Sequence, residues 1–128
     1  MSMKTLHLVS SAYRATLEEQ DDTVIWLMRA MRGAGARLDL VLLGNAVNYA
    51  VARQDASGLR FGEWQQAHPP RLAEDLAALA RSDASVFIVQ EDVVARGLDA
   101  SELVEGVTPI ARAALAPLFG DYDRVCHW

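Results

Sequence analysis

Short, largely apolar stretches alternate with segments of helical spacing along the whole chain. Five of these stretches are predicted to be strands, because polar or turn-forming residues bound each of them: Leu6–Val9, Arg37–Leu43, Ser85–Gln90, Gly106–Ile110 and Tyr122–Trp128. The second stretch is apolar enough to be covered on both faces of a sheet. Pro109, in the fourth, is typical of an edge strand, since proline cannot donate a ladder hydrogen bond.

Helices are predicted between these strands from apolar residues that recur every three or four positions. The segment Val24–Met31 follows a run of acids that complements a helix dipole, and it ends at Gly33 and Gly35. Its predicted buried face holds Trp26, Leu27, Ala30 and Met31. The segment Arg71–Ala80 presents Leu72, Leu76, Leu79 and Ala80 on one face. Shorter helical segments are predicted at Ala46–Ala52, Ala100–Val104 and Ala111–Phe119.

Alternation of strands and helices from end to end favours parallel pairing through right-handed crossovers. We therefore predict a single α/β domain over residues 1–128 with about five strands. Residues 53–70 contain Gly58, Gly62, Pro69 and Pro70 and show no clear periodicity. This segment is predicted to be an exposed loop or insertion, in which Trp64 either packs back on the core or anchors a protein partner.

Composition narrows the classes of partner. The formal charge of −5 disfavours direct binding to nucleic-acid phosphates, which rests on Lys and Arg. The single cysteine cannot form an internal disulfide, which fits a reducing cytoplasm. The first residues lack a signal-peptide pattern, and no apolar run reaches membrane-spanning length. We expect a cytoplasmic protein without membrane contact.

Common catalytic signatures are missing from the sequence. It contains neither a phosphate-binding glycine loop nor the Gly-x-Ser-x-Gly elbow of hydrolases. His7, His68, His127 and Cys126 do not have the spacing of metal ligands. We therefore predict no metal and no cofactor.

Polar residues follow three of the predicted strands, at the edge where open α/β sheets bind ligands. They are Ser10, Gly44, Asn45, Gln90, Glu91, Asp92 and Arg96. Glu91 and Asp92 have the chemistry of general acids or bases, but capping of the following helical turn is the more common role of such acids. Arg96 either binds an anion or closes a turn with Gly97, and the turn is favoured.

Cys126 has two interpretations. A partly exposed thiol whose pKa is lowered by His127 or Arg124 could be a nucleophile or a sulfur carrier. Cysteine is also among the most buried residue types, which favours packing. Strand alternation puts Val125 and His127 on one face and Cys126 and Trp128 on the other. His7, inside the first strand, is more simply a buried imidazole with a satisfied hydrogen bond.

Three segments of the chain resemble DsrH/TusB-like proteins of the DsrE/DsrF/DsrH sulfur-relay superfamily. The run Val86–Leu98 is similar to their strand followed by Glu-Asp-x-x-Ala-Arg-Gly-Leu. Leu6–Ser11 resembles their opening, and Gly106–Trp128 resembles their ending. The resemblance covers about the first ten and the last forty-five residues, and residues 53–70 are longer than such chains require.

The resemblance implies a three-layer α/β/α sandwich with a mostly parallel five-stranded sheet. It also implies assembly into homo-oligomers, or with DsrE- and DsrF-like subunits, and exchange of persulfide with a sulfur-carrier protein. Such relays serve tRNA 2-thiolation or intracellular sulfur oxidation. The sulfur-carrying subunits place a cysteine just after the third strand, where this chain has Gln90 and Glu91. The early cysteine of some DsrH-like chains is also missing.

Three functions are compatible with these observations. The first is an accessory, non-catalytic subunit of a sulfur relay that acts through protein–protein interfaces. The second is a sulfurtransferase that carries persulfide on Cys126 with help from His127. The third is a small-ligand or nucleotide-binding module at the strand edge around Ser10, Gly44, Asn45 and Gln90–Asp92. We favour the accessory subunit.

Overall fold

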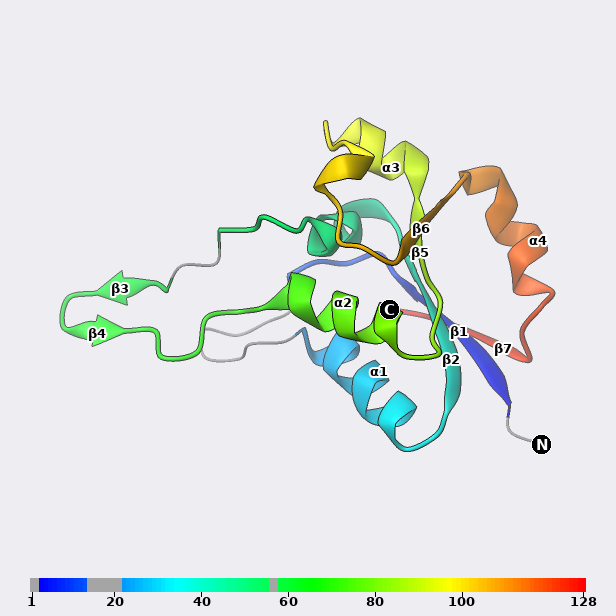
Figure 1. The fold of residues 1–128 in the computed structure, drawn as a ribbon, viewed down its shortest axis with the longest axis horizontal. Helices are drawn as coiled ribbons and strands as arrows, with labels where there is room; N and C mark the ends of the chain where they lie inside the picture. The colour runs from blue at the N-terminus through cyan, green and yellow to red at the C-terminus, as the bar shows by residue number, and fades with distance from the viewer. Residues whose placement is uncertain (1–2, 14–21, 56–57) are drawn as a thin grey trace.

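Five parallel strands form the central sheet of the protein, seen in the computed structural model, which describes residues 3–13, 22–55 and 58–128 (Figure 1). The strands lie in the order β6-β5-β2-β1-β7, and every neighbouring pair is parallel. Their bounds are β1 (Lys4–Val9), β2 (Arg37–Leu42), β5 (Val86–Val89), β6 (Val107–Ile110) and β7 (Arg124–His127). The predicted α/β class and five-stranded parallel sheet are confirmed, and the strand that contains Pro109 lies at an edge.

Helices cover both faces of this sheet, so the protein has three layers (Figure 1). The helices α1 (Thr23–Gly33) and α2 (Leu72–Arg81) pack on one face around Leu38, Leu40 and Leu42. The short helix α4 (Leu115–Phe119) lies on the other, against Leu6, Leu8, Val41 and Val89. The connections contain η1 (Gly44–Ala50), α3 (Gln90–Ala95), η2 (Ala100–Glu102) and η3 (Arg112–Ala114). The predicted helices are therefore present, with η1, η2 and η3 as 3₁₀ turns.

Helix α1 buries a different face from the one predicted. Val24, Ile25 and Met28 are buried, whereas Trp26 is 54% exposed. Both sets of residues have helical spacing, and the neighbouring β2 and α2 decide which of them is covered. Among the acids that precede the helix, Asp22 is the N-cap, and its carboxylate accepts hydrogen bonds from the amides of Val24 and Ile25. The acids at 18, 19 and 21 lie outside the described residues.

Residues 53–70 contain a short hairpin of β3 (Arg60–Phe61) and β4 (Trp64–Gln65). The sequence does not predict it, because two-residue strands are too short to show alternation. Gly62 adopts a φ of 60° in the connecting turn, which glycine does without steric cost. The hairpin projects away from the sheet and helices (Figure 1). The rings of Phe61 and Trp64 stack on it with their centroids 5.7 Å apart.

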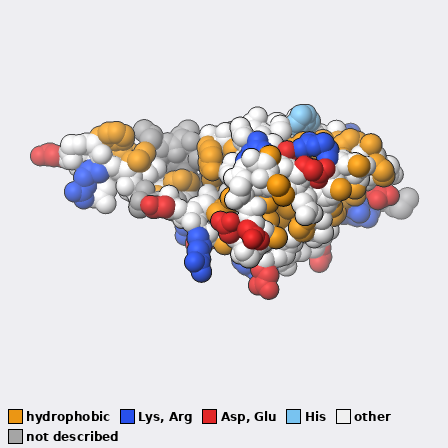
Figure 2. Space-filling model, turned by 90° about the horizontal axis from the view of Figure 1, so that it is seen from above, with side chains coloured by type: hydrophobic (Ala, Val, Ile, Leu, Met, Phe, Trp, Pro, Cys, Tyr) orange, Lys and Arg blue, Asp and Glu red, His pale blue; other side chains and the backbone are white. Residues whose placement is uncertain are grey.

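The sheet face that carries α4 is only partly covered. Residues 94–128 are all described, and none of them is buried, although they include two strands of the sheet. Leu115, Leu118 and Phe119 pack against the second apolar cluster while remaining partly exposed, and Val125 is 39% exposed. In Figure 2 hydrophobic side chains gather at this end of the molecule and on the hairpin at the opposite end. Two apolar surfaces are therefore open to a partner.

Candidate functional site

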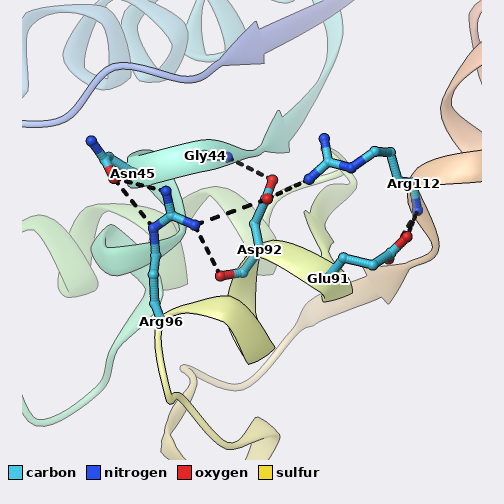
Figure 3. A network of polar contacts seen from close by, with 6 residues as sticks. All are labelled: Gly44, Asn45, Glu91, Asp92, Arg96 and Arg112. Carbon is cyan, nitrogen blue, oxygen red and sulfur yellow. Dashed lines mark hydrogen bonds and ion pairs between the residues drawn. The ribbon is translucent and has the colours of Figure 1, made fainter.

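The carboxyl ends of the parallel strands meet at one edge of the sheet and bring several predicted residues together. Ser10 follows β1, Gly44 and Asn45 follow β2, and Gln90, Glu91 and Asp92 form the first turn of α3 after β5. Gln90 and Glu91 are exposed, whereas Asp92 is 9% exposed. The Asp92 side chain contacts Gly44, Arg96 and Arg112, and so joins the segments that follow β2, β5 and β6 (Figure 3).

Asp92 links the loops that follow β2, β5 and β6. Its Oδ2 atom accepts a hydrogen bond of 2.8 Å from the Gly44 amide. Its Oδ1 atom forms ion pairs with the guanidinium groups of Arg112 and, at 3.9 Å, Arg96. A buried carboxylate requires such partners, since leaving it unpaired costs several kcal/mol. Arg112 is a member of this site that the sequence did not predict.

Gly44 is constrained by both conformation and space. Its φ is 56°, in the left-handed region, and a Cβ atom there would lie 3.3 Å from the carbonyl oxygen of Ser10. Only glycine adopts this φ without steric cost. The close approach also shows that the loop after β1 touches the loop after β2.

The side chains of Glu91 and Asp92 contact other loops and do not cap helix α3, and a general acid or base role for them stays a prediction. Helix α3 begins after Val89 without a side-chain cap. Both acids instead contact neighbouring loops. Asp92 accepts the Gly44 amide, and the two carboxylate oxygens of Glu91 share the Arg112 amide at 2.9 and 3.0 Å. Glu91 therefore holds the first residue of η3 through a contact that its two oxygens share.

Arg96 binds a side chain after β2. Its Nη2 and Nε atoms donate to Asn45 Oδ1 at 2.8 and 3.3 Å, and Nη1 donates to the carbonyl of Asp92 at 3.2 Å. Gly97 follows with a φ of 69°, as the turn interpretation predicts. Together, Arg96 and Arg112 balance the charges of Glu91 and Asp92, so the cluster is electrically neutral.

A second polar group joins the ends of β1 and β7. Ser10 Oγ lies 2.9 Å from His127 Nε2, and the Ser10 amide donates to the Trp128 carbonyl at 3.3 Å. His127 is exposed on the same sheet face as its register partner Leu8. The sequence named Ser10 and His127 separately, but their pairing depends on β7 lying beside β1.

Cys126 lies apart from the Asp92 cluster. Three strand spacings separate β7 from β5, which is about 14 Å at the usual separation of neighbouring strands. Its register partner is His7, whereas His127 pairs with Leu8, so Cys126 and His127 point to opposite faces. Cys126 is a free thiol of intermediate burial.

His7, next to Cys126, is buried and hydrogen-bonded. Its Nδ1 atom accepts from Trp128 Nε1 at 3.1 Å, and the two rings stack with centroids 6.2 Å apart. Burial lowers the pKa of His7 from its ordinary value of 6.5, since desolvation disfavours the charged imidazolium. His7 is therefore neutral near pH 7 and supplies no positive charge to the neighbouring thiol.

The lowered pKa of His7 makes stability depend on pH. Above about pH 6.5 the imidazole is neutral in both the folded and the unfolded chain. As the pH falls below that value, the unfolded chain binds the proton first, so the free energy of unfolding decreases. We expect this decrease in wild type and a shallower one in His7→Asn, measured by urea denaturation across this pH range. Superimposable pH profiles of the two proteins would contradict the prediction, and His127→Asn is the exposed control.

Within residues 3–13, 22–55 and 58–128, no group of three or more His, Cys, Asp and Glu side chains could hold a metal ion. None of the helices described is long and apolar enough to cross a membrane.

The order of the strands and the helices on both faces define the chain as a three-layer α/β/α protein with a parallel five-stranded sheet. The sequence model of the DsrE/DsrF-like family matches residues 3–128. The chain therefore belongs to the DsrE/DsrF-like family, which supports a role related to sulfur relay in general terms. No curated protein matches the sequence.

Two solved structures share the fold. The crystal structure of the ychN protein from E. coli has a TM-score of 0.73 and 19% identity, and the alignment covers 98% of this chain and 99% of that one. The structure of MTH1491 from Methanobacterium thermoautotrophicum, described as a protein of unknown function, has a TM-score of 0.61 and 13% identity, with coverage of 98% and 99%. At these identities the likeness shows the fold.

Proposed function

We propose that this protein is an accessory, non-catalytic subunit of a sulfur relay and acts through protein–protein interfaces. The observation that carries the proposal is the chemistry at the end of β5. By the resemblance described above, sulfur-carrying subunits hold their cysteine at that position, but this chain has Gln90 and Glu91 there. Persulfide transfer requires a thiol, and neither residue provides one.

The contacts around the end of β5 support a structural role for this edge. The oxygens of Glu91 and Asp92 are engaged by Arg112, Gly44 and Arg96. A general acid or base must be within hydrogen-bond reach of its substrate, whereas the contacts described for these two carboxylates are with the chain itself. Here the two carboxylates fix η3 and the loop after β2 instead.

The open sheet face supplies a surface for other subunits. No residue in the fully described range 94–128 is buried, and the apolar side chains of α4 and β7 are partly exposed. Interfaces between permanent subunits resemble a domain core cut in half. A DsrE- or DsrF-like subunit on this face would bury Leu118, Phe119 and Val125.

The partners and compartment follow from this proposal. They are a second copy of this chain or DsrE- and DsrF-like subunits, together with a sulfur-carrier protein, in the cytoplasm. The relay would serve tRNA 2-thiolation or intracellular sulfur oxidation. The net charge of −5 favours contact with other proteins over direct contact with tRNA phosphates.

A second candidate is persulfide transfer on Cys126, favoured by the partial exposure of this free thiol. Activated cysteines usually lie beside a positive group that stabilises the thiolate. The imidazole of His7 is neutral near pH 7 because burial lowers its pKa. His127 points to the opposite face of the sheet. The accessory subunit is therefore the better supported function.

The two candidates predict different masses after sulfur loading. We expect the intact mass of wild type to remain unchanged after incubation with a cysteine desulfurase and cysteine, because the chain lacks a thiol at the end of β5. A sulfur-carrying family member treated in the same way is the positive control. Cys126→Ser is the matched variant.

If wild type gains one sulfur that reductant removes, and Cys126→Ser gains none, the result would favour persulfide transfer on Cys126 over the accessory role.

A second experiment tests the accessory role directly. The protein is expected to co-purify with a DsrE- or DsrF-like subunit, and Phe119→Ser with Val125→Ser is expected to abolish that complex.

A further inference from the structure

A polar cavity of 330 Å³ lies at the amino ends of β1 and β2, at the edge of the sheet opposite to the Asp92 cluster. Its lining comes from these two strands, the last turn of α1 and the segment before β5. The polar residues of the lining are Lys4, Arg32, Arg37, Asp39, Asp83 and Ser85. The volume is at the lower end of the range of about 300–1,000 Å³ that holds small ligands. The charges of the lining therefore determine which small ligand the cavity suits.

Three cationic side chains meet at this cavity. Lys4 and Arg37 are register partners on the parallel strands β1 and β2, so both side chains leave the same face of the sheet. Like charges on neighbouring strands repel each other. Arg32 joins them from α1, where its Nη1 atom donates to the Ala36 carbonyl at 3.3 Å. The chain as a whole has a charge of −5, so this grouping of cations runs against its composition. An anion between the three would relieve their repulsion.

The two acids of the lining leave it with a net positive charge. Asp39 is 6% exposed, and its oxygens accept the Ser85 amide at 2.7 Å and the Tyr122 hydroxyl at 2.6 Å. Burial and this hydrogen bond raise the pKa of Tyr122, so its hydroxyl remains a donor to Asp39. The side chain of Asp83 is 95% exposed, and an ion pair at such a surface contributes little. One acid is therefore engaged inside the protein, and the other is screened by water.

Lys4 is held in position while its N–H donors stay available. Its Nζ atom lies 4.8 Å from the centroid of the Tyr122 ring and 3.8 Å from Asp39 Oδ2. The second distance exceeds the length of an N–H···O hydrogen bond, about 2.7–3.2 Å. Within residues 3–13, 22–55 and 58–128, no acceptor lies within hydrogen-bond distance of this ammonium. Its three N–H donors are therefore directed to whatever fills the cavity.

We propose that this cavity binds a small phosphate monoester, whose phosphate group lies between Lys4, Arg32 and Arg37. Such a group carries a charge of about −1.5 to −2 at pH 7 and three acceptor oxygens, which suits three cations. A guanidinium group also matches two phosphate oxygens at once. One water takes up about 30 Å³, so the cavity has room for an organic group beside the phosphate, against Leu38. Side chains here replace the glycine loop that the sequence lacks.

The test is isothermal titration calorimetry of the purified full chain with glycerol 3-phosphate in about 0.1 M salt, where distant charges are screened. We expect one molecule to bind per chain. Lys4→Gln and Arg37→Gln are each expected to weaken binding about tenfold or more, because each removes a charged hydrogen-bond donor. Arg37 is exposed at the start of β2, so its variant tests the site even if Lys4→Gln unfolds.

Arg124→Gln is the matched control. Arg124 is exposed at the same edge of the sheet, at the start of β7, but it does not line the cavity. Its loss is expected to leave the affinity within about twofold of wild type, because a charge outside the cavity acts through water and salt. Absence of saturable binding to wild type overturns the proposal. An equal loss of affinity in Arg124→Gln and Arg37→Gln also overturns it.

A second titration, with inorganic phosphate, separates the ester from the free ion. We expect inorganic phosphate to bind more weakly than glycerol 3-phosphate, because it lacks the organic group that fills the rest of the cavity. Equal affinities would show an adventitious ion only and overturn the proposal. This inference goes beyond the proposed function. Neither titration involves sulfur transfer, so failure here leaves the accessory role standing, and failure of that role leaves this result standing.

Discussion

Asp92→Ala is expected to lower the free energy of unfolding by about 3 kcal/mol. The carboxylate is 9% exposed, binds the Gly44 amide and pairs with Arg112 and Arg96. Removing it leaves the Gly44 amide without this acceptor and places two guanidinium groups near each other without the acid between them. Urea denaturation measures the change, and an unchanged m-value shows that the folded state remains compact.

Asp92→Asn is the matched control for this variant. Its amide oxygen keeps an acceptor for Gly44 but removes the negative charge that attracts Arg112 and Arg96. We expect about half of the loss found for Asp92→Ala. Equal stability of wild type and Asp92→Ala would show that the Asp92 contacts do not hold the strand-edge loops together.

The second large effect is expected for Asp22→Ala, again about 3 kcal/mol. Asp22 is fully buried, caps α1 through the amides of Val24 and Ile25, and accepts the Tyr49 hydroxyl at 2.6 Å. The substitution therefore removes a helix cap and a buried partner of Tyr49 together. Thermal and urea unfolding both report the loss.

Two variants separate these contributions. Tyr49→Phe removes the hydroxyl and retains the cap, and a loss of about 1 kcal/mol is expected. Asp22→Asn keeps an oxygen for the helix amides and should fall between the wild type and Asp22→Ala. If Tyr49→Phe costs as much as Asp22→Ala, the cap contributes little and the buried hydroxyl accounts for the effect.

Local pattern predicted the centre of the sheet most directly, because β2 and β5 are largely apolar runs between turn residues. The predicted buried face of α1 was wrong because Trp26 and Met28 both belong to stripes with helical spacing. Only the packing of neighbouring elements determines that Met28 is buried. The hairpin at Arg60 and Trp64 was missed because its strands are too short for alternation to be visible.

The site was predictable where it depends on strand ends and unpredictable where it depends on strand order. Gly44 and Asp92 each follow a strand, so the parallel sheet brings them to one edge. Arg112 joins Asp92 because β6 lies beside β5, and His127 joins Ser10 because β7 lies beside β1. No spacing in the sequence reveals which strands are neighbours. The capping role assigned to Glu91 failed for the same reason, since its partner Arg112 comes from another strand end.

The pairing of β1 with β7 also delays closure of the sheet during translation. Thr5 is in register with Arg124, and Leu8 with His127, so one border of β1 stays unpaired until β7 has been synthesised. At the usual rate of synthesis this delay is on the order of ten seconds. A nascent chain can pair β1 with β2 in that time, but the other border keeps its backbone groups open to mispairing. Emergence of β7 from the ribosome therefore governs when this border of β1 is covered.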